Sequence, residues 1–232
     1  MKPIPSREEP EYYEKTEFIK SDFVEIVTGN LFIVEMQYPL RKMNNAEKQC
    51  FVRKEVYEHL VEAASGLPTG YKFKIWDAWR PFALQKELYT DYSVDIIKDF
   101  ELERCTEEQK KKVIRKFVSD PIENVMVPPV HTTGGAVDLT IVNPNGQELD
   151  MGSEFDEFSD RTYTAFYENE KAYEIRDNRR LLFHTMTDAG FTNLPSEWWH
   201  YDYGDRFWGY YQSRPAMYMG VFVKGEINEE DK

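Results

Sequence analysis

Residues 131–142 read His-Thr-Thr-Gly-Gly-Ala-Val-Asp-Leu-Thr-Ile-Val. The second part of this stretch, residues 136–142, is rich in β-branched side chains, which is typical of a buried strand. The two glycines before it allow the backbone to turn sharply, and Asn-Pro-Asn-Gly at residues 143–146 predicts a turn after it. The stretch therefore predicts a strand that carries Asp138 and a preceding loop that carries His131.

Further strands and helices are predicted on both sides of this strand. Two β-rich runs at residues 22–28 and 31–37 are separated by Gly29-Asn30, which favours a tight turn. Residues 71–77 alternate between polar and apolar side chains, as a half-buried strand does. Helices are predicted at residues 48–64, 82–89, 106–118 and 177–189, the third with a capping box at Thr106. Because strands and helices mingle without a strict βαβ rhythm, we predict an α+β fold with a small, mainly antiparallel sheet flanked by helices.

The length of the chain, 232 residues, suits one large domain or two small ones. Residues 1–20 are polar and rich in Pro, Glu and Tyr, so we expect an N-terminal arm that lies over the surface. No linker or abrupt change in composition divides the rest, and residues 21–232 are expected to form a single domain. Within it, residues 125–130 and 150–170 are expected to be mostly loop.

The charge of the chain excludes some classes of partner. A formal net charge of −13 argues against nucleic acid, whose phosphates require clustered Lys and Arg, and disfavours an anionic membrane surface. No segment approaches the roughly 18 apolar residues that span a bilayer, and the N-terminus lacks the apolar part of a secretory signal. Cys50 and Cys105 fit no Cys-x-x-Cys site and are expected to be ordinary thiols. We therefore expect a cytoplasmic protein without nucleic-acid or membrane partners.

The chain has four histidines, which differ in their surroundings. His59 and His184 fall within predicted helices, and a structural role is expected for both. His131 precedes the glycine turn, and a His on that loop can converge with Asp138 on the following strand. His and carboxylate are both good zinc ligands, although a His and an Asp seven residues apart are common and indicate a metal only weakly.

A second group of candidates is Glu197-Trp198-Trp199-His200. Glu197 and His200 share a face in a helical turn but lie on opposite faces of a regular strand, so a common site requires this segment to turn. The two tryptophans would exclude water and raise the basicity of Glu197. The alternative is that this aromatic segment is simply part of the core.

The third candidate is Arg80, which follows the strand predicted at residues 71–77. An arginine there offers a planar fork to a carboxylate or to a developing oxyanion, and the alternative is an ion pair with Asp77. Two histidines and an aspartate leave the fourth position of a zinc ion open to water, whose pKa falls to about 7. A nearby carboxylate takes a proton from that water, and a fixed cation stabilises the tetrahedral intermediate, so together the three groups suit a zinc hydrolase.

A series of motifs covers roughly residues 70–205 in order: Trp76-Asp77-x-x-Arg80-Pro81, His131-x-x-Gly134-x-Ala136-x-Asp138-Leu139-Thr140, Met151-Gly152-Ser153-x-Phe155-Asp156, Asn178-Arg179-Arg180, Gly190-Phe191 and Glu197-Trp198-Trp199-His200-Tyr201. In combination they resemble the zinc D-alanyl-D-alanine dipeptidases of the vancomycin-resistance type, which belong to the wider family of zinc D-Ala-D-Ala carboxypeptidases. Each motif alone is much less specific than the set.

The resemblance implies a role for each matching residue. It implies one Zn²⁺ per chain, held by His131, Asp138 and His200. Glu197 would be the general base that later passes a proton to the leaving amine, and Arg80 would stabilise the transition state.

The resemblance also implies how the ends of the substrate are bound. Asp156 matches the position that recognises the free ammonium of the substrate, and Asp77 would support the site. Two departures bear on specificity: Pro129 stands where these dipeptidases usually carry a serine that helps to hold the end groups, and Thr133 stands where they often carry an arginine.

Three functions follow from these observations. The first is hydrolysis of D-alanyl-D-alanine or a similar small dipeptide, which Asp156 and the absence of a signal sequence favour. The second is a zinc D,D- or L,D-carboxypeptidase or endopeptidase that acts on peptidoglycan stem peptides, which the departures at Pro129 and Thr133 leave open. The third is a zinc-binding module without turnover, which the presence of both Glu197 and Arg80 disfavours. A small peptide is the expected partner in the first two cases.

Overall fold

Strands and helices alternate irregularly along the computed structural model, which describes residues 1–11 and 13–228. The strands are β1 (Phe23–Ile26), β2 (Phe32–Val34), β3 (Cys50–Arg53), β4 (Lys72–Asp77), β5 (Ala136–Val142), β6 (Thr192–Asn193) and β7 (His200–Asp202). The α-helices are α1 (Gln37–Leu40), α2 (Lys54–Ser65), α3 (Phe82–Asp99), α4 (Glu107–Ile114), α5 (Tyr173–Asp188) and α6 (Arg206–Gln212). Short 3-10 helices are η1 (Val130–Thr133), η2 (Asp160–Thr162), η3 (Phe166–Asn169) and η4 (Lys224–Asn228).

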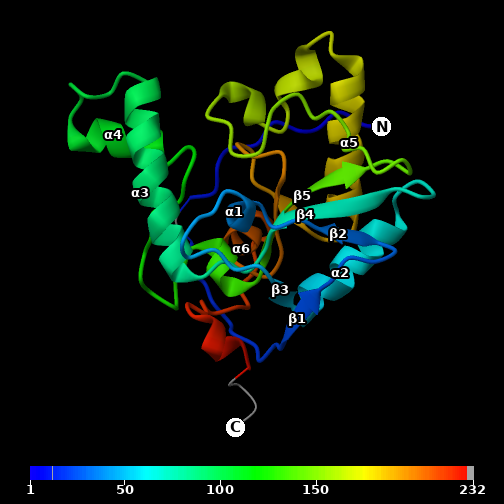
Figure 1. Cartoon of the computed structure of the whole chain (residues 1–232), viewed down its shortest axis with the longest axis horizontal. Coiled ribbons are helices and arrows are strands. Elements are labelled where there is room, and N and C mark those ends of the chain that lie inside the picture. The colour runs from blue at the N-terminus through cyan, green and yellow to red at the C-terminus, as the bar shows by residue number, and fades with distance from the viewer. Residues whose placement is uncertain (12, 229–232) are drawn as a thin grey trace.

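The larger sheet has five strands in the order β2-β4-β5-β7-β6, and β1 pairs with β3 in a separate two-stranded sheet (Figure 1). In the larger sheet β2 and β4 run parallel, whereas the pairs β4–β5, β5–β7 and β6–β7 are antiparallel. The predicted α+β class with a small, mainly antiparallel sheet is therefore confirmed.

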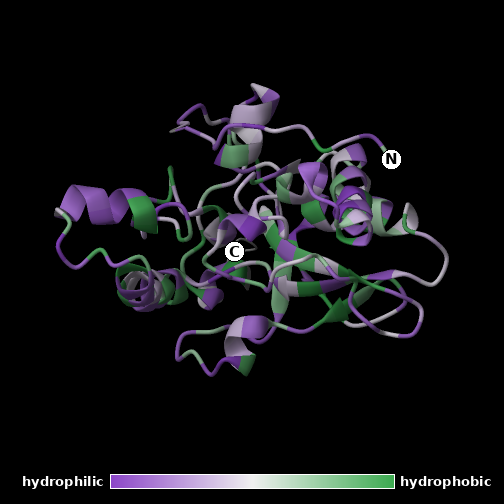
Figure 2. Ribbon diagram, turned by 90° about the horizontal axis from the view of Figure 1, so that it is seen from above, coloured by the Kyte–Doolittle hydropathy of each residue, from purple (hydrophilic) through white to green (hydrophobic). Residues whose placement is uncertain are grey.

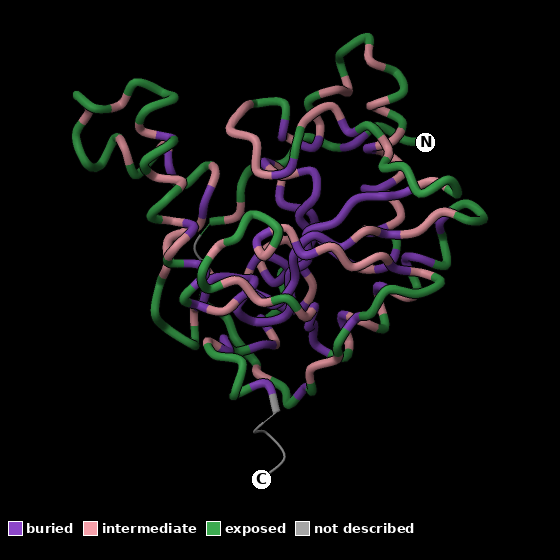
Figure 3. Tube along the Cα trace, in the orientation of Figure 1, coloured by how far each residue is buried: buried purple, intermediate pink, exposed green. Residues whose placement is uncertain are grey.

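Strand β5 forms the middle of the larger sheet and coincides with the strand predicted at residues 136–142. All of its residues are buried, and Val137, Leu139 and Ile141 belong to the main hydrophobic core. In Figure 3 the buried part of the chain is concentrated around this strand, while the exposed parts lie at the outer loops and helix ends. A strand paired on both edges and covered on both faces needs the continuous β-branched run that this sequence has.

The helices cover the sheets with one apolar face each. Helix α2 buries Val56, Leu60, Ala63 and Ala64, which recur at helical spacing, and contacts α5, β1 and β3. Hydrophilic and hydrophobic residues alternate along the helical ribbons in Figure 2, as expected for helices that bury one face. The predicted capping box is confirmed, since the Thr106 side chain accepts a hydrogen bond from the backbone N–H of Gln109 at the start of α4.

Several predicted boundaries were wrong. The helix predicted at residues 48–64 begins only at Lys54, because residues 50–53 form β3; Val52 also fits the helical spacing of Val56, which explains the early start. The runs on either side of Gly29-Asn30 are shorter than predicted and do not pair, since β1 joins β3 and β2 joins β4. Helix α3 extends ten residues beyond residue 89, and α4 ends before residue 118.

The N-terminal segment contacts the surface at several points. The backbone N–H of Ile4 donates to Glu168, and Thr16 forms a bridge with Ala216. Cys50 and Cys105 are both free thiols, as predicted. Within the described ranges, none of the helices combines the length and the apolar composition that crossing a membrane requires.

Two glycines with left-handed backbone angles allow a test of how tightly the loop before β5 is packed. A Cβ on Gly134 (φ 76°) would lie 2.4 Å from Cε1 of Phe23, whereas a Cβ on Gly146 (φ 79°) would have nothing within 4 Å. Both alanine variants suffer the backbone cost of about 1–2 kcal/mol. Gly134→Ala also meets the Phe23 ring, so we expect it to lose roughly 3 kcal/mol or more of unfolding free energy.

Urea unfolding of both variants measures this difference directly. Equal losses at Gly134 and Gly146 would contradict the close packing of this loop against Phe23.

Candidate metal centre

The pairing register of three neighbouring strands aligns polar side chains across the sheet. Asp138 of β5 lies opposite Asp77 of β4 on one side and opposite His200 of β7 on the other. Residues directly opposite each other in an antiparallel pair project from the same face. The sheet therefore brings together side chains that are 61 or more residues apart in the sequence (138 − 77 = 61).

His131 reaches the same point from η1, just before β5. Its ring Nδ1 donates to the backbone oxygen of Ala78 over 2.8 Å, and its own carbonyl accepts a hydrogen bond from the backbone N–H of Arg80. The 3-10 turn ends at Gly134, whose positive φ lets the chain enter β5. The ring is thus fixed to the segment that follows β4.

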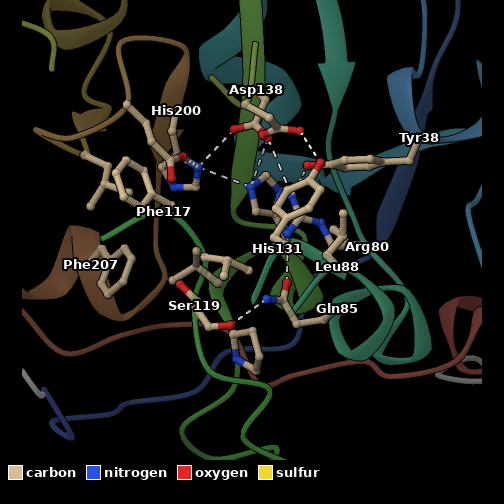
Figure 4. A pocket seen from close by; sticks show the side chains of 17 residues that line it. Tyr38, Arg80, Gln85, Leu88, Phe117, Ser119, His131, Asp138, His200 and Phe207 are labelled. Atoms are coloured by element: carbon tan, nitrogen blue, oxygen red, sulfur yellow. Dashed lines mark hydrogen bonds and ion pairs between the residues drawn. The ribbon is translucent and has the colours of Figure 1, made fainter. Parts of the chain in front are cut away.

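The side chains of His131, Asp138 and His200 point toward one another (Figure 4). Nε2 of His131 lies 3.1 Å from Nδ1 of His200, which lies 3.0 Å from Oδ1 of Asp138. Nε2 of His131 lies 3.4 Å from Oδ2 of Asp138. All three residues are buried. Their donor atoms all lie within 4.8 Å of one another, close enough to bind one metal ion together.

The hydrogen bonds around the two histidines suit a cation at this point. A carbonyl only accepts, so Nδ1 of His131 carries the ring proton and Nε2 presents a lone pair. Nε2 of His200 lies 2.8 Å from Oδ1 of Asp202, which leaves the lone pair of a neutral ring on Nδ1. Two imidazole lone pairs and a carboxylate then face one another without a proton between them, and a metal ion satisfies all three.

The spacing of the three donor atoms also fits zinc. Two ligands at about 2.0–2.2 Å from a tetrahedral zinc ion lie roughly 3.3–3.6 Å apart. The observed separations of 3.0, 3.1 and 3.4 Å differ from this by a few tenths of an ångström.

The charges beside the histidines favour a positive charge between them. Burial lowers the pKa of His200, but Asp202 and Asp138 outweigh this effect and place its pKa well above the ordinary value. Burial likewise opposes ionisation of Asp138, yet His131 and His200 hold its pKa below the usual range. A proton or a metal ion can satisfy this demand, so the two compete for the site.

Glu197 lies beside the three converging side chains. The backbone N–H of His200 donates to the carbonyl of Glu197, so the segment turns as a shared site requires. Oε2 of Glu197 lies 3.8 Å from Nδ1 of His200, and its side chain is 21% exposed. Burial raises the pKa of Glu197 to about 8, which is the direction expected from desolvation.

Arg80 projects into the same pocket from the segment after β4. Its Nε donates to Asp77 over 2.9 Å, Nη1 to Gln85 over 2.8 Å and Nη2 to the hydroxyl of Tyr38 over 3.2 Å. Nη2 also lies 3.6 Å from Oδ2 of Asp138. The ion pair with Asp77 is therefore present, and it holds the guanidinium beside the candidate metal ligands rather than away from them.

Asp156 lines the same pocket from the loop between β5 and η2. It has a positive φ of 60°, and Arg179 of α5 fixes its loop by donating to the carbonyls of Met151, Arg161 and Tyr163. Oδ2 of Asp156 already accepts hydrogen bonds from Arg41 and from the hydroxyl of Tyr92, both over 2.7 Å. The structure therefore places the predicted ammonium-binding carboxylate at the pocket, but with a cation already beside it.

Of the other residues considered from the sequence, Pro129 lies at the pocket, and His59, His184 and Thr133 have partners elsewhere. The ring of His59 packs on Tyr203, with centroids 4.2 Å apart, and His184 bonds to the carbonyl of Lys2. Pro129 lines the pocket. The hydroxyl of Thr133 instead donates to the carbonyl of Val130 within its own turn.

Sequence reasoning missed several residues of the site. Asp202 had a usable signal, since residues two apart in a strand share a face and it follows His200 at that spacing. Tyr38, Arg41 and Tyr92 had none, because α1 and α3 approach the loop of Asp156 only in the folded chain.

Comparison with known proteins shows the family of this chain. A family model described as D-Ala-D-Ala dipeptidase matches residues 40–219, which include His131, Asp138 and His200. The chain belongs to this family. A D-alanyl-D-alanine dipeptidase of Synechocystis sp. is 34% identical over 172 residues, which are 68% of this chain and 70% of that protein.

A second dipeptidase and one solved structure are less similar in sequence to this chain. The D-alanyl-D-alanine dipeptidase of Escherichia coli is 30% identical over 157 residues, which are 67% of this chain and 68% of that protein. A mutant of the vancomycin-resistance D,D-pentapeptidase VanY, solved in complex with Zn(II), is 15% identical with a TM-score of 0.40. The match covers 75% of this chain and 85% of that one.

Removal of one candidate ligand tests the metal centre. We expect His200→Ala to lose bound zinc, because two remaining donors hold the ion far less tightly than three. His184→Ala is the matched control, since it removes a histidine outside the site and should keep zinc. Elemental analysis after dialysis measures both, and full zinc occupancy in His200→Ala would contradict the assignment.

Proposed function

We propose that this chain is a zinc-dependent peptidase that hydrolyses D-alanyl-D-alanine or a similar small dipeptide. The observation that carries the proposal is the convergence of two imidazoles and a carboxylate beside Glu197 and Arg80. Membership of the D-Ala-D-Ala dipeptidase family supports the substrate class. So do the Synechocystis and Escherichia coli relatives, which are D-alanyl-D-alanine dipeptidases.

His131, Asp138 and His200 would hold the zinc ion. When bound, zinc polarises the scissile carbonyl and lowers the pKa of a water molecule to about 7. The hydrogen bonds to Ala78 and Asp202 fix which nitrogen of each histidine faces the ion and orient the two rings.

Glu197 acts as the proton carrier of the reaction. Burial raises the pKa of Glu197 above that of an ordinary carboxyl, so its carboxylate accepts a proton more readily. Glu197 takes a proton from the attacking water, holds it on the carboxylate, and passes it to the amine that leaves when the peptide bond breaks.

Arg80 stabilises the negative charge that develops on the peptide oxygen. Its pKa lies above the ordinary value, because Tyr38, Asp77 and Asp138 outweigh the effect of burial, so it stays charged. Three side chains hold the guanidinium in place, which means that it need not reorganise when charge develops. Asp156, which lines the same pocket, binds the amino end of the substrate.

The setting of the enzyme follows from its substrate. Free D-alanyl-D-alanine is a cytoplasmic compound used to build peptidoglycan, so we place the enzyme in the cytoplasm with a role in cell-wall metabolism. We further assign residues 1–20 to an arm and residues 21–232 to a single peptidase domain.

A panel of three peptides tests the proposed function and its alternative. Zinc-loaded protein is incubated with D-Ala-D-Ala, L-Ala-L-Ala and a pentapeptide stem, and amine release is measured. We expect D-Ala-D-Ala to be hydrolysed most efficiently. Preference for the stem would favour a carboxypeptidase, and no turnover of any peptide would favour a zinc-binding module.

Replacement of the proposed base separates catalysis from metal binding. Glu197→Gln should keep its zinc, because Glu197 is not among the converging donors, and lose about 10²–10⁴-fold in kcat. Glu62→Gln, at an exposed position of α2, is the control and should keep both zinc and activity. Turnover close to normal in Glu197→Gln would remove Glu197 as the base.

A further inference from the structure

The carboxylate assigned to the amino end of the substrate is already neutralised within the chain. Oδ2 of Asp156 accepts from Nη1 of Arg41 and from the hydroxyl of Tyr92, both over 2.7 Å. Nη1 of Arg41 also donates to the Tyr92 hydroxyl over 2.9 Å, which closes a triangle of three hydrogen bonds. Arg41 and Asp156 together carry no formal charge.

Arg41 is held in this position by more than the ion pair. Its Nη2 donates to the carbonyl of Phe155 over 3.1 Å, and its guanidinium lies over the rings of Phe155 and Tyr38 at 5.1 and 5.8 Å. The Arg41 side chain is 37% exposed and that of Asp156 14%, so the cation lies at the rim and the carboxylate deeper. A planar group that is stacked and hydrogen-bonded in this way stays close to Asp156.

The Arg41–Asp156 pair changes which amino-terminal group of a substrate this end of the pocket favours. A lone buried carboxylate strongly favours a cationic partner, whereas an ammonium bound at Asp156 also meets the like charge of Arg41 a few ångströms away. Oδ1 of Asp156 makes no hydrogen bond to any residue in the described part of the chain, so it can still accept an N–H. An amide N–H satisfies that oxygen without electrostatic repulsion.

We propose that Arg41 determines the end-group specificity of the peptidase, widening its substrates from free dipeptides to small peptides acylated at their amino end. This inference rests on the proposed function, because it concerns the same pocket and the same hydrolysis. Arg41 acts through Asp156 and is a specificity-determining residue, not a catalytic one. A merely structural Arg41 would instead hold Asp156 in its left-handed backbone conformation.

The test compares D-Ala-D-Ala with N-acetyl-D-Ala-D-Ala in zinc-loaded protein, measuring kcat and KM for each. The unaltered chain should hydrolyse both peptides. In Arg41→Gln the carboxylate loses its cation, so KM for the free dipeptide should fall with little change in kcat. The preference for the free over the acetylated peptide, as a ratio of kcat/KM values, should rise at least about fivefold.

Two further variants show whether a change in peptide preference comes from the positive charge at position 41. Arg41→Lys keeps the positive charge without the planar fork and should keep the preference of the unaltered chain, and it remains informative if Arg41→Gln does not fold. Arg180→Gln removes an arginine from an ion pair with Glu168, neither of which lines the pocket, and it should leave the hydrolysis of both peptides unaffected.

Each outcome decides the inference. An unchanged or lower preference in Arg41→Gln overturns it, as does a preference in Arg41→Lys that departs from that of the unaltered chain. A higher KM for both peptides in Arg41→Gln shows that Arg41 only positions Asp156, which also overturns it. If the unaltered chain hydrolyses neither peptide, the proposed function itself fails, and that result is distinct from the other three.

Discussion

The register of β4, β5 and β7 is the constraint on which the site depends. It sets Asp77, Asp138 and His200 side by side on one face of the sheet, in a fully buried part of the molecule. A slip of one residue in either pairing would turn a ligand to the opposite face, because successive side chains alternate. The apolar residues that alternate with Asp138 along β5 thus fix the metal centre as well as the core.

Burial of so many polar groups is tolerable because nearly every proton and lone pair has a partner. The ring N–H groups of the two histidines donate hydrogen bonds to the carbonyl of Ala78 and to Asp202. The N–H groups of Arg80 donate to Asp77, Gln85 and Tyr38. The inward lone pairs of His131 and His200 and the carboxylate of Asp138 face one another with only acceptors opposite, and Oδ2 of Asp202, behind His200, has no hydrogen-bond partner among the described residues. Since unpaired buried acceptors are costly, the folded chain is strongly disposed to bind a cation at that point.

Local sequence determined the parts of this molecule that depend on neighbours in the chain. Strand β5 and the capping box at Thr106 were predicted correctly, and the ordered motifs contain the three candidate ligands that the fold brings together. Residues 50–53 were misassigned because Val52 fits a helical period, and only pairing with β1 makes this segment a strand. Arg41, just after α1, and Tyr92, in α3, were not predicted because they lie 115 and 64 residues from Asp156 in the sequence. Contacts of that range depend on tertiary packing, which no local pattern encodes.

Arg80 and Arg41 each pair with a carboxylate of the pocket, and these pairs determine where its negative charge remains. Arg80 is paired with Asp77 and Arg41 with Asp156, so these two pairs are close to neutral. Asp138 is then the carboxylate that faces the candidate cation directly, with Asp202 behind His200 and Glu197 beside it. Without Arg41, the Asp156 carboxylate would be unbalanced in the same pocket and would draw any cation, including a substrate ammonium. The Arg41–Asp156 pair therefore confines the negative potential to the place where the metal and the proton transfer need it.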